Sequence, residues 1–228
     1  MNNVIIACDF STNEELHSFI KKILPHKPVL KIGLELYCAL GNQVVLDLKK
    51  QGYKIFLDLK LHDIPNTVAK TIKVLDKLDV DFLTIHSLGG LDMMKAARKA
   101  TKKIKLLAVT ILTSISGNIL FDQLFISEPI DKTIMSLALN AYVSKLDGVI
   151  CSVHESKLIK NVTNNKLLTV CPGIRLDGQD TNDQSRIATP QFAKINNVDY
   201  IVVGRAITAS ENPKEMYEKV NKLFTKGE

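Results

Sequence analysis

Eight short apolar segments recur along the chain, and longer amphipathic segments separate them. Each is rich in Val, Ile, Leu or Phe and nearly uninterrupted, a pattern typical of strands buried on both faces. The eight are Val4–Asp9, Val29–Leu34, Lys54–Lys60, Phe82–His86, Leu106–Leu112, Gly148–Val153, Leu167–Gly173 and Tyr200–Arg205. Such an alternation predicts an α/β protein with a parallel sheet.

The segments between these strands carry helix signals. Thr12–Leu24 opens on a threonine followed three residues later by glutamate, as in a capping box, and Pro65–Leu78 begins with a proline. Lys132–Leu146 and Pro213–Phe224 have the same character. Eight strand–helix units in 228 residues predict a single-domain TIM (β/α)₈ barrel over residues 1–228, rather than an open doubly wound sheet.

Charge and composition exclude several classes of function. The chain carries a net charge of +6, but its lysines are scattered, aromatic residues make up only 6 %, and tryptophan is absent. A nucleic-acid surface needs a dense basic face with stacking aromatics, so we expect no nucleic-acid partner. A modest positive field suits an anionic metabolite instead.

The cysteines and the N-terminus point to the cytoplasm. Cys8, Cys38, Cys151 and Cys171 form no C-x-x-C pair and no metal-ligand spacing, so we expect no metal and reduced thiols. The first residues lack a signal-peptide pattern, and no apolar stretch is long enough to span a bilayer. The sequence therefore predicts a cytoplasmic protein without a membrane partner.

The two longest irregular stretches are Thr113–Ile130 and Arg175–Pro190. Both follow the C-terminal end of a strand, the face on which barrels place their active sites, so we expect binding loops or lids there. Asp177, Asp180 and Asp183 in the second stretch lack the glycine and glutamate of a calcium loop, and we interpret them as solvated.

A charged cluster stands at the end of the third predicted strand. Asp58 and Lys60 are two residues apart, which places both on one face of a strand; Lys31 lies on the preceding strand, and Asp63 follows the strand end. These four charges can form a structural ion-pair network. Burying them is costly, however, and an ammonium group held beside carboxylates can deliver a proton to a carbanion, so we favour a catalytic cluster.

The residues around this cluster resemble the orotidine 5′-phosphate decarboxylase family, bacterial type. The signature is Asp58-Leu-Lys-Leu-His-Asp-Ile-Pro-Asn-Thr67. Similar segments run in order along the chain: Ala7–Asp9, Lys31–Tyr37, Leu83–His86, Ala108–Ser114, Cys171–Arg175, Asp183–Arg186 and Val203–Arg205. Cys171 departs from the threonine frequent in the family, which replaces one small side chain by another.

The resemblance implies a reaction and its catalytic residues. Orotidine 5′-monophosphate (OMP) loses CO₂ and becomes UMP in the last step of UMP synthesis, with no metal and no cofactor. Lys60 matches the lysine that protonates C6 of the pyrimidine, and Asp58 matches the carboxylate placed against the substrate carboxylate. Lys31 matches the lysine between the charges and the ribose hydroxyls.

The resemblance also implies a homodimer with shared sites. Asp63 matches the last acid of the catalytic array, which the family supplies from the partner subunit together with Ile64 and Thr67. Asp9 matches a ribose-binding residue. His62 matches no catalytic role, and we interpret it as structural.

A phosphate site is expected at the opposite end of the substrate. TIM barrels commonly bind phosphate with the loops after strands seven and eight, which here contain Gly204 and Arg205. By resemblance, Gln184 reaches across from the closing loop, Arg175 anchors the start of that loop, and Thr113 reads the pyrimidine ring.

Two other functions stay open at this point. Magnesium-dependent keto-gulonate-phosphate decarboxylases and hexulose-phosphate synthases share the barrel and the D-x-K-x-x-D string, but they place an acidic metal ligand where this chain has Lys31. A non-catalytic nucleotide-binding barrel would have no use for the Lys/Asp array. Activity in the presence of EDTA would exclude the magnesium-dependent enzymes, and turnover of OMP would exclude the non-catalytic barrel.

Overall fold

The chain folds into a closed barrel of eight parallel strands, which confirms the predicted fold. The structure is a computed structural model, and it describes residues 3–176 and 187–227. Each strand pairs with the next in sequence, and β8 closes the barrel against β1. The strands are β1 Val4–Ala7, β2 Val29–Gly33, β3 Lys54–Leu61, β4 Phe82–His86, β5 Lys105–Val109, β6 Gly148–Ile150, β7 Leu168–Cys171 and β8 Tyr200–Val203.

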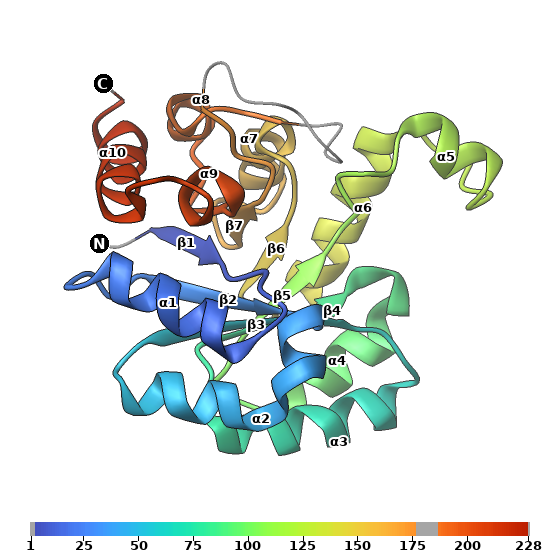
Figure 1. The fold of residues 1–228 in the computed structure, drawn as a ribbon. Coiled ribbons are helices and arrows are strands. Elements are labelled where there is room, and N and C mark those ends of the chain that lie inside the picture. The colour runs from blue at the N-terminus through green and yellow to red at the C-terminus, as the bar shows by residue number, and fades with distance from the viewer. Residues whose placement is uncertain (1–2, 177–186, 228) are drawn as a thin grey trace.

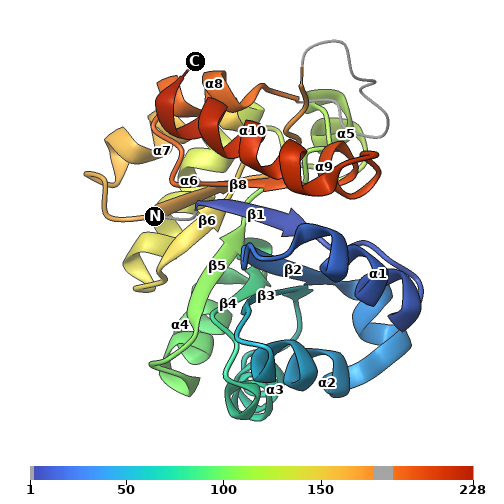
Figure 2. The ribbon, with the colours of Figure 1, turned by 60° about the vertical axis from the view of Figure 1, so that its left-hand side comes forward.

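Helices surround the strands on the outside of the barrel (Figures 1 and 2). The C-terminal helix α10 packs beside α1 and α8, which closes the outer ring. The α-helices are α1 Asn13–Ile23, α2 Leu34–Lys50, α3 Pro65–Leu75, α4 Gly90–Ala100, α5 Gly117–Asp122, α6 Ile130–Val143, α7 Val153–Val162, α8 Pro190–Ile195, α9 Arg205–Thr208 and α10 Pro213–Lys226. Short 3₁₀ helices cover Asp76–Leu78 and Ser87–Gly89.

Two of the helix starts follow the local sequence signals closely. Thr12 caps α1 in a complete capping box with Glu15, and Pro65 opens α3. The stretch Thr113–Ile130 was expected to be irregular throughout, and that expectation was wrong: it contains the six-residue helix α5, whose N-cap Ser116 accepts a hydrogen bond from the Ile119 N–H. A helix this short has too few residues to show an amphipathic period.

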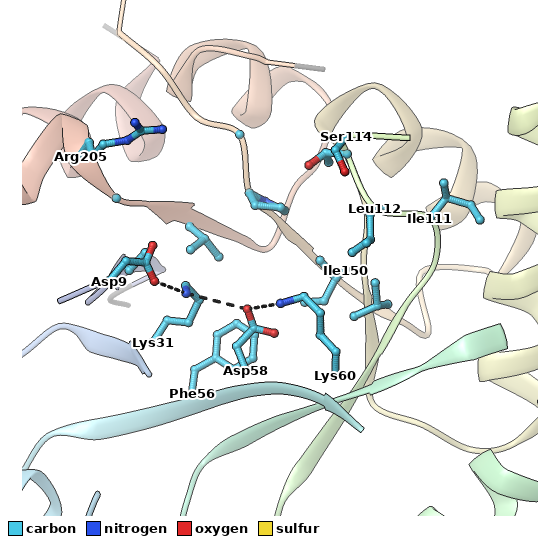
Figure 3. A pocket seen from close by; sticks show the side chains of 18 of the residues that line it. Asp9, Lys31, Phe56, Asp58, Lys60, Ile111, Leu112, Ser114, Ile150 and Arg205 are labelled. Atoms are coloured by element: carbon cyan, nitrogen blue, oxygen red, sulfur yellow. Dashed lines mark hydrogen bonds and ion pairs between the residues drawn. The ribbon is translucent and has the colours of Figure 1, made fainter. Parts of the chain in front are cut away.

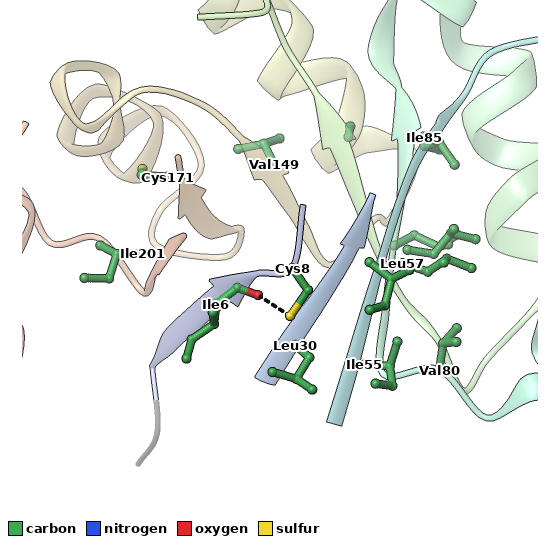
Figure 4. Packing of buried hydrophobic residues seen from close by; sticks show 14 of the residues in the cluster. Ile6, Cys8, Leu30, Ile55, Leu57, Val80, Ile85, Val149, Cys171 and Ile201 are labelled. Carbon is green, nitrogen blue, oxygen red and sulfur yellow. Dashed lines mark hydrogen bonds between the residues drawn. The ribbon is translucent and has the colours of Figure 1, made fainter. Parts of the chain in front are cut away.

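Strand alternation divides the buried residues into two cores. One set faces outward beneath the helices; Ile6, Leu30, Ile55, Leu57 and Ile201 are among its members in Figure 4. The other fills the barrel interior: Ile5, Ala7, Val29, Phe56, Phe82, Leu107, Val170 and Val202.

Near the carboxyl ends of three strands, the residues that point into the barrel interior are polar. Lys31, Asp58 and Thr84 each lie two residues beyond an inward-facing apolar residue, on β2, β3 and β4. Successive residues of a strand point to opposite faces, so these three side chains occupy the next layer of the interior. The apolar side chains thus fill the barrel interior beneath this polar layer.

Gly148 on β6 permits a close approach of β7, and it provides a test of this packing. A Cβ atom there would lie 2.5 Å from the Leu168 carbonyl oxygen and 2.9 Å from Leu107 Cδ2. We expect Gly148→Ala to lower the free energy of unfolding by about 1–3 kcal/mol because backbone must shift to admit the methyl group. Gly117→Ala is the control, since its added Cβ would meet no atom within 4 Å. Equal melting temperatures for the two variants would contradict this account.

Candidate functional site

A cavity of about 380 Å³ opens at the carboxyl ends of the strands. This size suits a small ligand, and the position is the one that TIM-barrel enzymes use. Eight of the twelve predicted site residues line it: Asp9, Lys31, Asp58, Lys60, Thr113, Arg175, Gly204 and Arg205. The structure therefore brings together residues from six different strand ends and the loops that follow them.

A chain of alternating charges crosses one side of the cavity (Figure 3). Lys31 Nζ donates to Asp9 Oδ1 at 2.8 Å and lies 3.9 Å from Asp58 Oδ2. Lys60 Nζ donates to the same Asp58 oxygen at 2.9 Å. The side chains of Lys31 and Asp58 are 12 % and 13 % exposed, whereas Lys60 is 33 % exposed and reaches into the cavity. Asp58 is thus held between two ammonium groups.

Lys60 reaches this position through an irregularity in β3. Leu57 pairs with Leu83 and Leu61 with Ile85, so three residues of β3 stand opposite one residue of β4. Lys60 itself has a φ of 49°, the left-handed region that costs roughly 1–2 kcal/mol for a residue with a Cβ. Bulges of this kind re-aim side chains beside active sites. The sequence predicted a regular strand here, and the shared location of Asp58 and Lys60 instead depends on the bulge.

Thr84 lies behind the charge chain. Its Oγ1 accepts the backbone N–H of Lys60 at 2.8 Å and donates to Asp58 Oδ1 at 2.8 Å. The residue is fully buried on β4. One hydroxyl therefore contacts both members of the Asp58–Lys60 pair.

Three predicted site residues lie outside the cavity. Asp63, Ile64 and Thr67 are exposed on the turn into α3 and its first residues. Asp63 Oδ1 accepts the Ile64 N–H at 2.6 Å, and Ile64 is 66 % exposed. Gln184 lies outside the described residues, together with Asp177, Asp180 and Asp183. This chain alone does not bring Asp63 to Lys60.

The opposite side of the cavity carries arginines. Arg205 follows Gly204 at the end of β8 and lies across the cavity from Lys60 (Figure 3). Arg175 follows β7, where its N–H donates to the Ala188 carbonyl at 2.9 Å and its side chain donates to the Ile174 carbonyl at 2.9 Å. The Ile174–Ala188 bridge brings together the two ends of the segment that separates β7 from α8.

Two histidines stack at the rim beside Lys60. The rings of His62 and His86 lie 5.2 Å apart, and the Leu88 N–H donates to His86 Nδ1 at 3.3 Å. Burial, and then the charges of His62 and Lys60, lower the pKa of His86 from 6.5 to about 4. The imidazole is therefore neutral at pH 7, as its acceptor role requires.

This lowered pKa predicts a pH dependence of stability. The folded protein binds the His86 proton more weakly than the unfolded chain, so the stabilisation is present above pH 6.5 and is lost as the pH falls toward 4. Because solvent reaches part of the ring, we expect wild type to lose on the order of 1 kcal/mol more than His86→Gln between about pH 7.5 and pH 5. Urea unfolding at both pH values measures the difference, and parallel losses in the two proteins would contradict the prediction.

Sequence reasoning missed several lining or supporting residues, including Thr84, His86, Ser114 and Phe56. Thr84 had a readable signal, since it is the polar residue that follows Phe82 on the inner face of β4. His86 ends β4 and Ser114 lies in the loop after β5, but neither residue has a distinctive spacing. Among residues 3–176 and 187–227, no three His, Cys, Asp or Glu side chains are grouped so as to hold a metal ion.

The fold and the site define a TIM-barrel enzyme with a lysine–carboxylate array facing arginines across one cavity. Residues 2–220 match the orotidine 5′-phosphate decarboxylase / HUMPS family, and the chain belongs to that family.

Individual relatives match over nearly the whole chain. An orotidine 5′-phosphate decarboxylase of Fusobacterium nucleatum is 42 % identical, over 99 % of this chain and 97 % of its own length. One of Oenococcus oeni is 45 % identical, over 97 % of this chain and 98 % of its own. A crystal structure of the Lactobacillus acidophilus enzyme superposes with a TM-score of 0.89 at 41 % identity, covering 99 % of this chain and all of that one.

Proposed function

We propose that this chain decarboxylates OMP to UMP and CO₂, with Lys60 as the proton donor. The observation that carries this proposal is the Asp9–Lys31–Asp58–Lys60 charge chain at the mouth of a barrel. The 42–45 % identity to full-length orotidine 5′-phosphate decarboxylases supports the substrate and the lyase reaction.

The reaction needs a group that stabilises and then protonates a carbanion. When the C6–carboxylate bond breaks, CO₂ leaves and the electron pair stays on C6. The Lys60 ammonium stabilises that charge by its fixed position and then transfers a proton, which forms the C6–H bond and leaves a neutral amine. Lys60 is 33 % exposed, so solvent can return the proton after the product leaves.

Asp58 and Lys31 organise the charges around the reacting carbon. Asp58 faces the substrate carboxylate, so loss of that carboxylate as neutral CO₂ relieves a repulsion between two anions. Lys31 joins Asp58 to Asp9, whose 60 % exposed side chain can accept hydrogen bonds from ribose hydroxyls. The two ammonium groups of Lys31 and Lys60 together balance the charges of the Asp9 and Asp58 carboxylates without a divalent ion. This balance supports a metal-free reaction.

The arginine side of the cavity suits the phosphate of the nucleotide. Arg205 offers a forked set of donors next to Gly204, where no side chain covers the backbone N–H. Arg175 holds the base of the β7–α8 segment, from which Gln184 would reach the phosphate, and Thr113 would contact the pyrimidine ring. Contacts far from C6 then contribute binding energy that positions the reacting atoms.

Arg205→Ala tests this assignment. We expect kcat/KM for OMP to fall by roughly 10²–10³-fold because a charge-assisted phosphate contact is lost while the Lys60 array is unchanged. Gln184→Ala should weaken catalysis in the same direction, and the double variant should be worse than either. Steady-state kinetics measure both effects. Unchanged kcat/KM in the double variant would remove the phosphate assignment.

We propose that the active unit is a homodimer. Asp63, Ile64 and Thr67 are exposed and lie outside their own chain's cavity, which fits a role in the cavity of a second copy. Ile64, which is 66 % exposed in the single chain, would be buried by such an interface. A C₂ dimer is the simplest closed arrangement in which each chain completes the other's site.

We place the reaction in the cytoplasm. All four cysteines are free thiols, in keeping with a reducing compartment. No helix in the described ranges is long and apolar enough to cross a membrane.

Purified protein incubated with OMP in EDTA tests the proposed function. Loss of the orotate absorbance with formation of UMP is the expected result. Activity that appears only after magnesium is added would move the chain to the metal-dependent enzymes that share its barrel. Binding of UMP with no turnover of OMP would instead indicate a non-catalytic nucleotide-binding barrel.

A further inference from the structure

We propose that the hydroxyl of Thr84 is a positioning group that holds Asp58 and Lys60 in their reactive arrangement. This inference rests on the proposed roles of those two residues. Thr84 contacts no part of the cavity; it is fully buried behind Asp58 on the neighbouring strand. It acts only through the groups that it contacts.

The hydrogen bonds of Thr84 define this role. Oγ1 accepts the Lys60 N–H at 2.8 Å and donates its own proton to Asp58 Oδ1 at 2.8 Å. A hydroxyl has one proton and can both accept and donate, so a single side chain satisfies both contacts. Valine has the same shape but can make neither.

The backbone contact explains how Lys60 keeps its left-handed conformation. In a regular parallel pairing, the N–H groups of β3 are available to carbonyl groups of a neighbouring strand. The bulge between Leu57 and Leu61 interrupts the pairing with β4 at Lys60, and Thr84 Oγ1 accepts the N–H in place of a carbonyl. The Thr84 side chain on β4 thus stabilises the bulge that directs Lys60 toward the cavity.

The carboxylate contact fixes the orientation of Asp58. Thr84 holds Oδ1, which leaves Oδ2 directed at Lys60 Nζ, 2.9 Å away, and at Lys31 Nζ, 3.9 Å away. If the carboxylate rotated, Oδ1 would no longer face Thr84 and Oδ2 would no longer face the two lysines. The orientations of both Asp58 and Lys60 therefore depend on one buried hydroxyl.

The test compares Thr84→Val with Thr84→Ser. We expect Thr84→Val to lower kcat by roughly 10–100-fold, the effect typical of lost supporting hydrogen bonds, with KM for OMP changed by less than about threefold. Thr84→Ser keeps the hydroxyl and should recover kcat to within about threefold of wild type. A fall in KM and kcat together, or no recovery in the serine variant, would overturn the proposal.

A buried threonine elsewhere in the barrel provides the control. Thr169 on β7 is also fully buried, and its hydroxyl contacts Ser156 and Asp199 away from the cavity. Thr169→Val should lower the melting temperature but leave kcat per folded molecule unchanged. If Thr84→Val does not fold, Thr84→Ala replaces it, and a kcat equal to that of Thr84→Ser would overturn the proposal.

Parallel assays of Lys60→Ala separate this inference from the proposed function. If Lys60→Ala is inactive and Thr84→Val has wild-type kcat, only the positioning role is wrong. If Lys60→Ala itself has wild-type kcat, the proposed function is wrong at its proton donor.

Discussion

Lys60→Ala is expected to abolish measurable decarboxylation, with kcat/KM lowered by about 10⁴-fold or more. Two contributions are lost together. The ammonium group no longer stabilises negative charge on C6. Lys31, the other described lysine that lines the cavity, donates to Asp9 at 2.8 Å and does not replace it. Asp58 also loses its 2.9 Å partner and then repels the substrate carboxylate with less compensation. Conversion of OMP followed by the loss of orotate absorbance measures the effect.

A second lysine of the same strand supplies the matched control. Lys54 opens β3 at the opposite end of the barrel and is exposed, so Lys54→Ala removes the same side chain far from the cavity. Its kcat/KM should stay within about twofold of wild type, since exposed substitutions away from a site have small effects. A Lys60→Ala variant that folds and turns over OMP at more than a hundredth of the wild-type rate would exclude Lys60 as the only proton donor.

The barrel could be predicted because its signals are periodic and repeated. Eight nearly uninterrupted apolar runs, separated by amphipathic segments, leave few arrangements that bury every strand on both faces. The ends of the elements follow the sequence less closely: α6 begins at Ile130, two residues before its predicted start. Helix α5 was missed because its cap, Ser116, is followed by only six helical residues.

The candidate site was predictable to the extent that it follows strand alternation. Lys31 and Asp58 lie on the inner face, two residues beyond Val29 and Phe56, as the spacing requires. The backbone conformation of Lys60, in contrast, does not follow from strand alternation. Its positive φ depends on a contact with Thr84, which is 24 residues away in sequence, and no local pattern in Asp58-Leu59-Lys60 reveals it. Tertiary contacts of this sort decide geometry at functional sites, where local rules are most often broken.

Mixing two inactive variants is expected to restore about one quarter of wild-type activity if each site is shared between two chains. Lys60→Ala disables the cavity of its own chain, whereas Asp63→Ala disables the cavity of the partner. Random exchange makes half of all dimers hybrid. In each hybrid, one cavity has both defects and the other has an intact Lys60 and an intact Asp63 from the partner. Half of the dimers are hybrids and half of the sites in each hybrid are native, so one quarter of all sites are native.

The control pair uses two residues that must belong to the same chain. Asp58 and Lys60 contact each other at 2.9 Å within one cavity, so hybrids of Asp58→Ala with Lys60→Ala contain no intact site and should stay inactive. Subunit exchange is measured separately with dimers carrying two different fluorescent labels. If exchange is complete and the Lys60→Ala and Asp63→Ala mixture stays inactive, Asp63 does not act across an interface.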